Sequence, residues 1–347
     1  MSSSRIDGGQ NRRGFLHRSA RALGTAAAAH LIGTEARSAG ISGAKRKDDR
    51  PMKIDAHGHI SQVEIQDLEG EYRKNWKYGM GARDNLYLMD AVGIEMQVLQ
   101  CAFYLHRYHR RVMKEHPGRF VAISKIDERL LPGERGLKLI QQHVEEWGFK
   151  GWYYDCWPPE QRVEMGMDPK EWGTPDPFHH FDHSRYDPQW ELVQSLGVPA
   201  CVTSYSYNFQ TLGPGLLNVL KRFPDLKVVV IHGYWPPSCV QEDGSVRIPD
   251  AVVELVKNYN VVMEILPGLQ HRSDLYGPGD AVLKAFYDTF GPAKLMWGSE
   301  YTHVDLPTVE QYRHQFDYIK ERCPYMSESD IARIRGGTAM EIYGIQG

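Results

Sequence analysis

The sequence predicts an α/β protein of the (β/α)8 TIM-barrel type, and two observations point to this fold. First, eight short apolar runs rich in Val, Ile and aromatic residues follow one another along the chain. Second, an amphipathic segment of helical length follows each run. Runs this short are typical of strands, and strands that alternate regularly with helices form parallel sheets. Eight such units are the number that closes into a barrel.

The individual elements follow from the same patterning. The predicted strands are 53–56, 96–102, 120–124, 151–154, 198–203, 227–231, 261–265 and 295–297. The predicted helices are 84–92, 108–115, 134–146, 187–195, 216–222, 249–257, 280–289 and 309–322, with a final helix over 328–343. The long polar insert 158–186 is rich in Pro, Gly and Asp, which argues against a helix, and we expect a lid-like loop there.

The composition is that of an ordinary globular protein. Lys and Arg number 41 against 44 Asp and Glu, a net charge of −3, and 41% of the residues are hydrophobic. These values exclude a disordered chain, a coiled coil and a collagen-like repeat. The near-neutral charge gives no basic surface for nucleic acid, so we expect a small-molecule substrate instead. The five Cys have no C-x-x-C spacing and predict neither a disulfide framework nor a zinc ribbon.

The amino-terminal segment resembles a twin-arginine export signal. Arg12 and Arg13 precede Phe15 and Leu16, and an Ala-rich stretch follows. This pattern predicts the twin-arginine export machinery as a partner and a periplasmic or extracellular mature chain, without a membrane span. The predicted regions are a signal peptide over 1–40, a linker over 41–51 and the barrel over 52–347.

Residues of metal-binding type follow three of the predicted strands. His57 and His59 come after the first strand, His232 after the sixth and Glu300 after the eighth. Chemistry in these barrels takes place at the carboxyl ends of the strands, so we expect the four side chains in one mouth. Two His at positions i and i+2 of an extended segment point to the same side and reach one ion.

Several segments resemble the amidohydrolase-related family, in the branch that includes aminocarboxymuconate semialdehyde decarboxylase and hydroxybenzoate decarboxylases. Among them are 54–59 (Ile-Asp-Ala-His-Gly-His), 231–233 (Ile-His-Gly) and 298–301 (Gly-Ser-Glu-Tyr). Matching pieces run in order from the first strand to the end of the chain. The resemblance implies a (β/α)8 barrel and one divalent metal bound by the first-strand histidines.

Two positions depart from the pattern that the resemblance implies. The family usually ends the fifth strand with a metal-binding His, where this chain has Thr203, and usually has Asp where this chain has Glu300. We therefore predict His57, His59 and Glu300 as ligands of one divalent metal, zinc, with no organic cofactor. His232 is either a fourth ligand or an acid/base beside the ion. A metal-free site, as in some lactonases that resemble this family, is the alternative.

Aromatic residues crowd the same strand ends. Loop Trp and Tyr side chains at a barrel mouth form flat, amphipathic walls that suit an aromatic, quinone-like or sugar ring. Asp155 and Cys156 directly after the fourth strand, and His179, His180 and His183 in the insert, are predicted substitutes as metal ligands, and a solvated loop is the alternative for the three histidines. The residues that we predict to contact a substrate are Tyr154, Trp157, Thr203, Tyr205, Tyr234 and Tyr301.

Three functions remain open at this point. The first is metal-assisted hydrolysis of a small cyclic or aromatic substrate such as a lactone or an amide. Glu300 would ligate the ion or accept a proton from water, and His232 would steady the oxyanion or protonate the leaving group. The second is a lyase, either a decarboxylase or a hydratase of an aromatic or enolic acid. The third is a non-catalytic binding barrel. A homodimer is compatible with each.

Overall fold

The described part of the chain lies within a single unit, 46–347, of this computed structural model. The predicted signal peptide and most of the predicted linker lie outside the described residues. For 209–211 only the backbone is described. The residues that the structure describes are 50–60, 81–100, 105–155, 180–203, 209–233, 239–266, 279–301 and 308–346.

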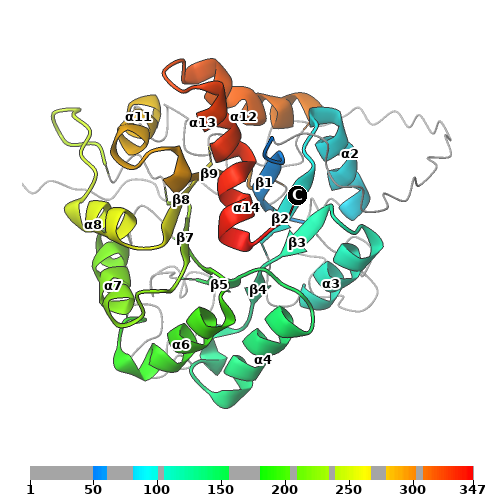
Figure 1. The fold of residues 1–347 in the computed structure, drawn as a ribbon, viewed down its shortest axis with the longest axis vertical. Coiled ribbons are helices and arrows are strands. Elements are labelled where there is room, and N and C mark those ends of the chain that lie inside the picture. Colours follow the sequence, from blue (N-terminus) through cyan, green and yellow to red (C-terminus); the bar gives the residue numbers. More distant parts are fainter. Residues whose placement is uncertain are drawn as a thin grey trace, which may run out of the picture. The chain divides into compact units, whose positions relative to one another are not determined.

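The described strands form a parallel ring. They are β1 (Ile54–Gly58), β2 (Met96–Leu99), β3 (Phe120–Ala122), β4 (Ser124–Lys125), β5 (Trp152–Tyr154), β6 (Ala200–Thr203), β7 (Val228–Ile231), β8 (Val261–Ile265) and β9 (Leu295–Trp297). Neighbours along the chain pair in parallel as β1-β2-β3 and β4 through β9. β3 and β4 flank Ile123 and together form the predicted run 120–124. A bridge between Gly58 and Tyr301 joins the last strand to the first, which confirms the predicted (β/α)8 barrel (Figure 1).

Helices surround this ring, and the last of them, α14 (Thr338–Tyr343), lies across one end of it (Figure 1). They are α2 (Ala82–Val92), α3 (His106–Glu115), α4 (Glu134–Glu145), α6 (Asp187–Leu196), α7 (Phe209–Arg222), α8 (Asp250–Asn258), α11 (Gly279–Phe290), α12 (Val309–Arg322), α13 (Glu328–Ala332) and α14 (Thr338–Tyr343). Short 3-10 turns lie at η4 (Glu128–Leu130), η6 (Ser184–Tyr186) and η8 (Pro292–Lys294).

The predicted final helix is interrupted. A π-helical segment, η9 (Arg333–Gly337), separates α13 from α14. A Cβ atom on Gly336 would lie 1.6 Å from the backbone oxygen of Met52, so only glycine lets the helix pass this close to the start of β1. The π-helix therefore marks the place where the carboxyl-terminal helix crosses the barrel.

Two apolar layers enclose the strands, because each strand is buried on both faces. Alternate residues such as Ala56, Cys201 and Ile231 fill the barrel interior, and α14 packs against this interior cluster. The residues between them, such as Trp152 and Val202, pack toward the surrounding helices. The pleat thus decides which side chains reach the barrel interior and its mouth.

A buried carboxylate closes the ring between β1 and β9. Asp55 accepts hydrogen bonds from the Ser299 backbone nitrogen (2.9 Å) and Oγ (2.7 Å), and from Tyr312 Oη of α12 (2.7 Å). Gln97 Nε2 of β2 donates to the same carboxylate at 2.9 Å. Burial raises the pKa of Asp55, and these donors oppose that rise. A single side chain therefore connects two strands and the last long helix to β1.

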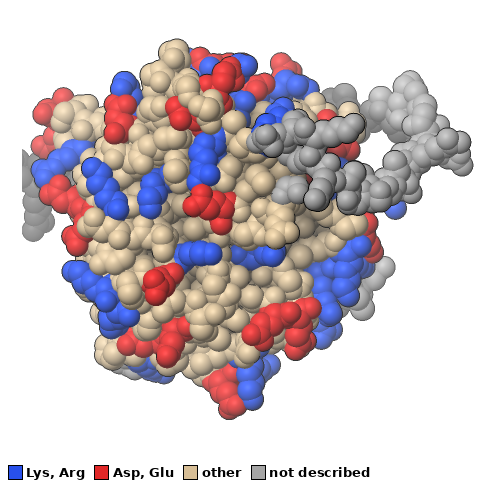
Figure 2. All heavy atoms as spheres, viewed as in Figure 1, with Lys and Arg blue, Asp and Glu red and all other residues tan. Residues whose placement is uncertain are grey.

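None of the described helices is both long enough and apolar enough to span a bilayer. Figure 2 shows Lys and Arg side chains interspersed with Asp and Glu on the face of the molecule that carries α14. This face therefore has no extended region of one charge.

We expect Tyr312→Phe to destabilise the fold more than Tyr287→Phe. Both tyrosines donate to an aspartate, at 2.7 Å to buried Asp55 and at 2.8 Å to Asp330 near the surface. Loss of a buried donor to a charged acceptor costs about 1.5–3 kcal/mol, whereas water replaces the surface bond at much smaller cost. Urea unfolding of the two variants measures the difference. Equal losses would contradict a closing role for Asp55.

Candidate active site

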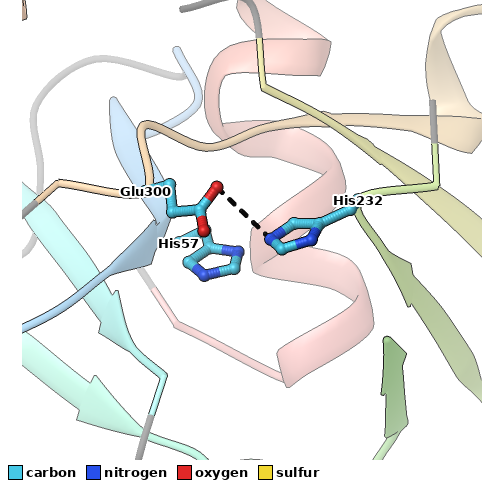
Figure 3. Close-up of side chains that lie close together, drawn as sticks. All are labelled: His57, His232 and Glu300. Carbon is cyan, nitrogen blue, oxygen red and sulfur yellow. Dashed lines mark ion pairs between the residues drawn. The ribbon is translucent and has the colours of Figure 1, made fainter. Parts of the chain in front are cut away.

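The predicted metal-binding residues lie at the carboxyl ends of β1, β7 and β9. His57 belongs to β1, His232 follows β7 and Glu300 follows β9. Each has one nitrogen or oxygen atom in a group whose members all lie within 4.8 Å of one another. All three side chains are buried, and Figure 3 shows them pointing toward one another. Residues from distant parts of the chain thus converge on one point.

Contacts within this group are close. His232 Nε2 lies 3.3 Å from Glu300 Oε2, the pair that is dashed in Figure 3. The rings of His57 and His232 are nearly parallel, with centroids 5.3 Å apart. A proton can pass between an imidazole and a carboxylate at such a distance, which is the arrangement needed for general acid–base chemistry.

His59 adjoins the group through His57. The Nε2 atoms of the two rings lie 3.0 Å apart. Gly58 between them has no room for a Cβ atom, which would lie 2.0 Å from Gln97 Nε2. The β1–β2 pairing shifts register between Asp55 and Gly58, and such irregularities commonly redirect side chains beside active sites. The pair therefore faces one point, as the i, i+2 spacing predicts.

Backbone strain coincides with the site. Among the described residues other than glycine, His232 (φ 54°) and Glu300 (φ 60°) are the ones with positive φ. Such a conformation costs about 1–3 kcal/mol and persists where the surroundings enforce it. The Glu300 nitrogen donates to the His57 oxygen at 2.7 Å, and the His232 nitrogen donates to Glu264 Oε2 at 3.1 Å. These bonds hold both residues in place.

Glu264 is the site residue that the sequence analysis missed. It lies in β8, is fully buried, and its Oε2 accepts from His57 Nδ1 at 2.9 Å as well as from the His232 nitrogen. No described group hydrogen-bonds its Oε1. The signal in the sequence was a glutamate inside an otherwise apolar strand, because carboxylates are rarely buried without a role.

Glu264 orients His57. Because Nδ1 donates to the carboxylate, the Nε2 lone pair of His57 is directed at the group shared with His232 and Glu300. Burial lowers the pKa of His57, but the charge and hydrogen bond of Glu264, with the charges of Glu300 and Asp55, outweigh it and raise the pKa. A more basic imidazole is a better metal ligand.

Of the predicted substrate contacts, Thr203 ends β6 beside the site, and two tyrosines are placed elsewhere. Tyr154 is fully buried on the helix side of β5, where its ring packs against Trp190 at 5.4 Å. Tyr301 turns toward α12, where its hydroxyl accepts from Gln315 at 2.8 Å. This packing does not support substrate contacts by either residue. Trp157, Tyr205 and Tyr234 lie outside the described residues.

The alternative metal ligands are also separate from the group. Asp155 Oδ2 contacts Lys125 Nζ at 3.2 Å. His180 and His183 are exposed, and His183 caps η6 by accepting from the Arg185 nitrogen. Cys156 and His179 lie outside the described residues. Within the part of the chain that the structure describes, the group of His57, His232 and Glu300 is the metal-binding cluster.

The fold is a (β/α)8 barrel, and its mouth carries a cluster of residues that could hold a metal ion. Residues 54–345 match the model of the amidohydrolase family, and the chain belongs to that family. The family is one of enzymes, which agrees with the sequence analysis. No curated protein sequence matches the chain.

Solved structures with the same fold share little sequence with this chain. A 2,6-dihydroxybenzoate decarboxylase from Rhizobium is 15% identical, covering 86% of this chain and 99% of its own, with a TM-score of 0.58. A putative 2-pyrone-4,6-dicarboxylic acid hydrolase from Pseudomonas putida is 16% identical (85% and 98% covered, TM-score 0.59). A 5-carboxyvanillate decarboxylase from Novosphingobium aromaticivorans with bound manganese is 14% identical (85% and 97%, TM-score 0.57).

The residues present fit the divalent metal that is typical of the superfamily. Two imidazoles and a carboxylate are a common ligand set for such ions and leave positions open for water or substrate. The His57 lone pair is oriented by Glu264, and the facing Nε2 atoms of His57 and His59 are compatible with two ligands of one ion. The Oε1 atom of buried Glu264 has no hydrogen-bond partner among the described residues, which also favours a positive charge at this point.

We expect Glu264→Gln to weaken metal binding about tenfold while the protein stays folded. The amide oxygen can accept the same two hydrogen bonds, but the negative charge that makes His57 more basic is lost. Competition between the protein and a chromophoric chelator for Zn²⁺ or Mn²⁺ measures the change. Glu254→Gln, at an exposed position of α8, is the control. Unchanged affinity would contradict the orienting role of Glu264.

Proposed function

We propose that the protein is a metal-dependent hydrolase of a small cyclic or aromatic substrate, such as a lactone or a cyclic amide. The observation that carries this proposal is the convergence of His57, His232 and Glu300 within 4.8 Å at the barrel mouth. Zinc is the ion that we expect, bound by His57, His59 and Glu300, with no organic cofactor.

The chemistry divides between the ion and the side chains. A bound divalent ion supplies Lewis-acid polarisation and lowers the pKa of nearby water. Glu300 accepts the proton that water loses, because its buried carboxylate lies 3.3 Å from His232. His232 passes a proton to the leaving oxygen or nitrogen as the ring opens. Glu264 holds His57 and the His232 backbone so that neither group has to reorganise.

The charges of the described mouth favour hydrolysis of an uncharged group. Glu264 and Glu300 are both carboxylates, and Lys125 at the end of β4 already contacts Glu128 (2.6 Å) and Asp155 (3.2 Å). In the described residues this lysine is therefore neutralised and is a weak partner for a substrate carboxylate. An ester or amide carbonyl needs no such partner.

A second candidate is a carboxy-lyase. Decarboxylases are among the proteins with the same fold, and His232 is placed to protonate a ring carbon after carbon dioxide leaves. The same ion would then bind the substrate carboxylate directly. The two candidates differ in their products, so an assay of both reactions separates them.

We expect the purified protein to carry a divalent metal and to hydrolyse an aromatic lactone such as dihydrocoumarin. His57→Ala should lower metal content and reduce kcat/KM more than about 100-fold. Elemental analysis and a lactone assay measure both effects, with His314→Gln, an exposed residue of α12, as the control.

Other results would redirect the assignment. Carbon dioxide release from 2,6-dihydroxybenzoate without lactone hydrolysis would establish the lyase. Full activity after complete removal of metal would overturn the metal mechanism. Metal binding without turnover of either compound would favour a binding barrel.

We also propose that the chain is exported by the twin-arginine machinery, to the periplasm or the outside of the cell. The support is the order Arg12, Arg13, Phe15, Leu16 and the Ala-rich stretch after it. This route carries folded proteins, which suits a metalloenzyme. The segment lies outside the described residues.

Replacement of Arg12 and Arg13 by Lys should keep the protein inside the cell, because the export receptor reads the arginine pair rather than its charge. Cell fractionation followed by immunoblotting measures the distribution. A Lys replacement of Arg5, which lies outside the pair, is the control. Normal export of the double variant would contradict the assignment.

A further inference from the structure

Two hydroxyl groups lie where β5 and β6 reach the barrel mouth. Thr203 is the last residue of β6 and Tyr153 is the middle residue of β5. Thr203 Oγ1 donates a hydrogen bond to Tyr153 Oη at 2.6 Å. The Tyr153 ring packs with the cluster that fills the barrel interior, whereas its neighbours Trp152 and Tyr154 face the helices.

The phenolic proton of Tyr153 is not used in the hydrogen bond between the two hydroxyl groups. Because Thr203 donates, Tyr153 Oη acts as the acceptor, and the phenolic proton needs another acceptor. No described group accepts it. Tyr153 is partly buried, whereas Thr203 is fully buried. The pair therefore presents a hydrogen-bond donor to whatever occupies the barrel mouth.

Lys125 and its carboxylates fix the ring of this tyrosine. Lys125 Nζ lies 4.7 Å from the centroid of the Tyr153 ring, and it is held there by Glu128 at 2.6 Å and Asp155 at 3.2 Å. A cation over an aromatic face restrains the ring. The donor is thus positioned before a ligand arrives, which is the condition for effective stabilisation of developing charge.

Tyr153 also remains protonated, at the end of the barrel that carries the metal-binding group. Burial raises the pKa of its phenol, as do the charges of Asp155, Glu300 and Glu264, against a smaller opposing effect of the Thr203 bond. The Tyr153 hydroxyl reaches Thr203, which pairs with Ile231 directly before His232, so the phenol lies at the same end of the barrel as Glu264 and Glu300. A phenol that keeps its proton is a donor at neutral pH.

We propose that Tyr153, oriented by Thr203, is the hydrogen-bond donor that stabilises the carbonyl oxygen of the substrate as it becomes negatively charged. This assignment rests on the proposed hydrolase. Water oxygen bonds to the carbonyl carbon as Glu300 takes a proton from that water, and the π electron pair of the carbonyl moves to the carbonyl oxygen, which the phenol holds. The electron pair on that oxygen then re-forms the C=O double bond, the ring C–O bond breaks, and His232 protonates the leaving oxygen. The matching substrate class is a lactone.

Tyr153→Phe should lower kcat for dihydrocoumarin about 100-fold with little change in KM, because the bond strengthens as charge develops. Thr203→Val should lower kcat about tenfold, and Thr203→Ser, which keeps the hydroxyl, should restore it. Zn²⁺ content, measured by elemental analysis, should stay at the wild-type level in all three. Tyr343→Phe is the matched control: its phenol is also buried in the barrel interior, but contacts Cys201 Sγ at 3.7 Å instead.

The possible failures are distinguishable. A Tyr153→Phe enzyme with wild-type kcat and wild-type metal content would overturn this assignment and leave the hydrolase standing. A rise in KM without a fall in kcat would overturn it as well, since it would show ground-state binding only. Absence of lactone turnover by the wild-type holoenzyme would overturn the proposed function and this assignment together.

Discussion

The carboxylate of Asp55 is the constraint on which the architecture of the site depends. It accepts hydrogen bonds from Ser299 of the β9 end, Tyr312 of α12 and Gln97 of β2, and its Oδ1 also lies 3.2 Å from the His57 nitrogen. A buried charge costs several kcal/mol unless it is fully hydrogen-bonded, and here the bonds from Ser299, Tyr312 and Gln97 also tie three separate elements to β1. Since His57 and Glu300 flank the two strand ends that Asp55 joins, closing the barrel and assembling the site are one event.

Closure also explains the strained residues. Glu300 adopts φ 60° directly after Ser299, whose backbone and hydroxyl are both bound to Asp55. The backbone of His232 is held in the same way by Glu264. The buried carboxylates of Asp55 and Glu264 therefore hold the strained backbone at these two positions. Such rigid support keeps catalytic side chains near their productive geometry without movement during the reaction.

The sequence predicted the ring of strands closely because each apolar run is short and bounded by polar segments. It predicted helix boundaries less well where a glycine or proline lies inside a helix. The predicted helix 216–222 begins at Phe209 in α7 although Pro214 lies inside it, and a Cβ on Gly215 would lie 2.6 Å from the Phe181 ring. That glycine makes room for an aromatic ring rather than breaking the helix, and a ring packed from a distant segment is not visible in local sequence.

The pleat limited prediction of the site in a similar way. His57, His232 and Glu300 could be named because a residue after a strand end faces the mouth whatever the phase of the strand. Inside a strand, alternate side chains point to opposite faces, so the position in this alternation decides which residues face the barrel interior. The run Trp152-Tyr153-Tyr154 has aromatic residues on both faces, and the sequence therefore does not indicate which tyrosine points inward. Glu264 was missed because the run was identified by its apolar neighbours. Only the register with β7 and β9 turns it toward His57.

The buried carboxylates at the barrel mouth favour a bound cation. Glu264 and Glu300 are buried at one end of the barrel, and the Oε1 atom of Glu264 has no hydrogen-bond partner among the described residues. The described lysine of that end, Lys125, is already bound to Glu128 and Asp155. Carboxylates in such surroundings are stable when a cation balances them. A divalent ion held by His57, His59 and Glu300 would provide that balance.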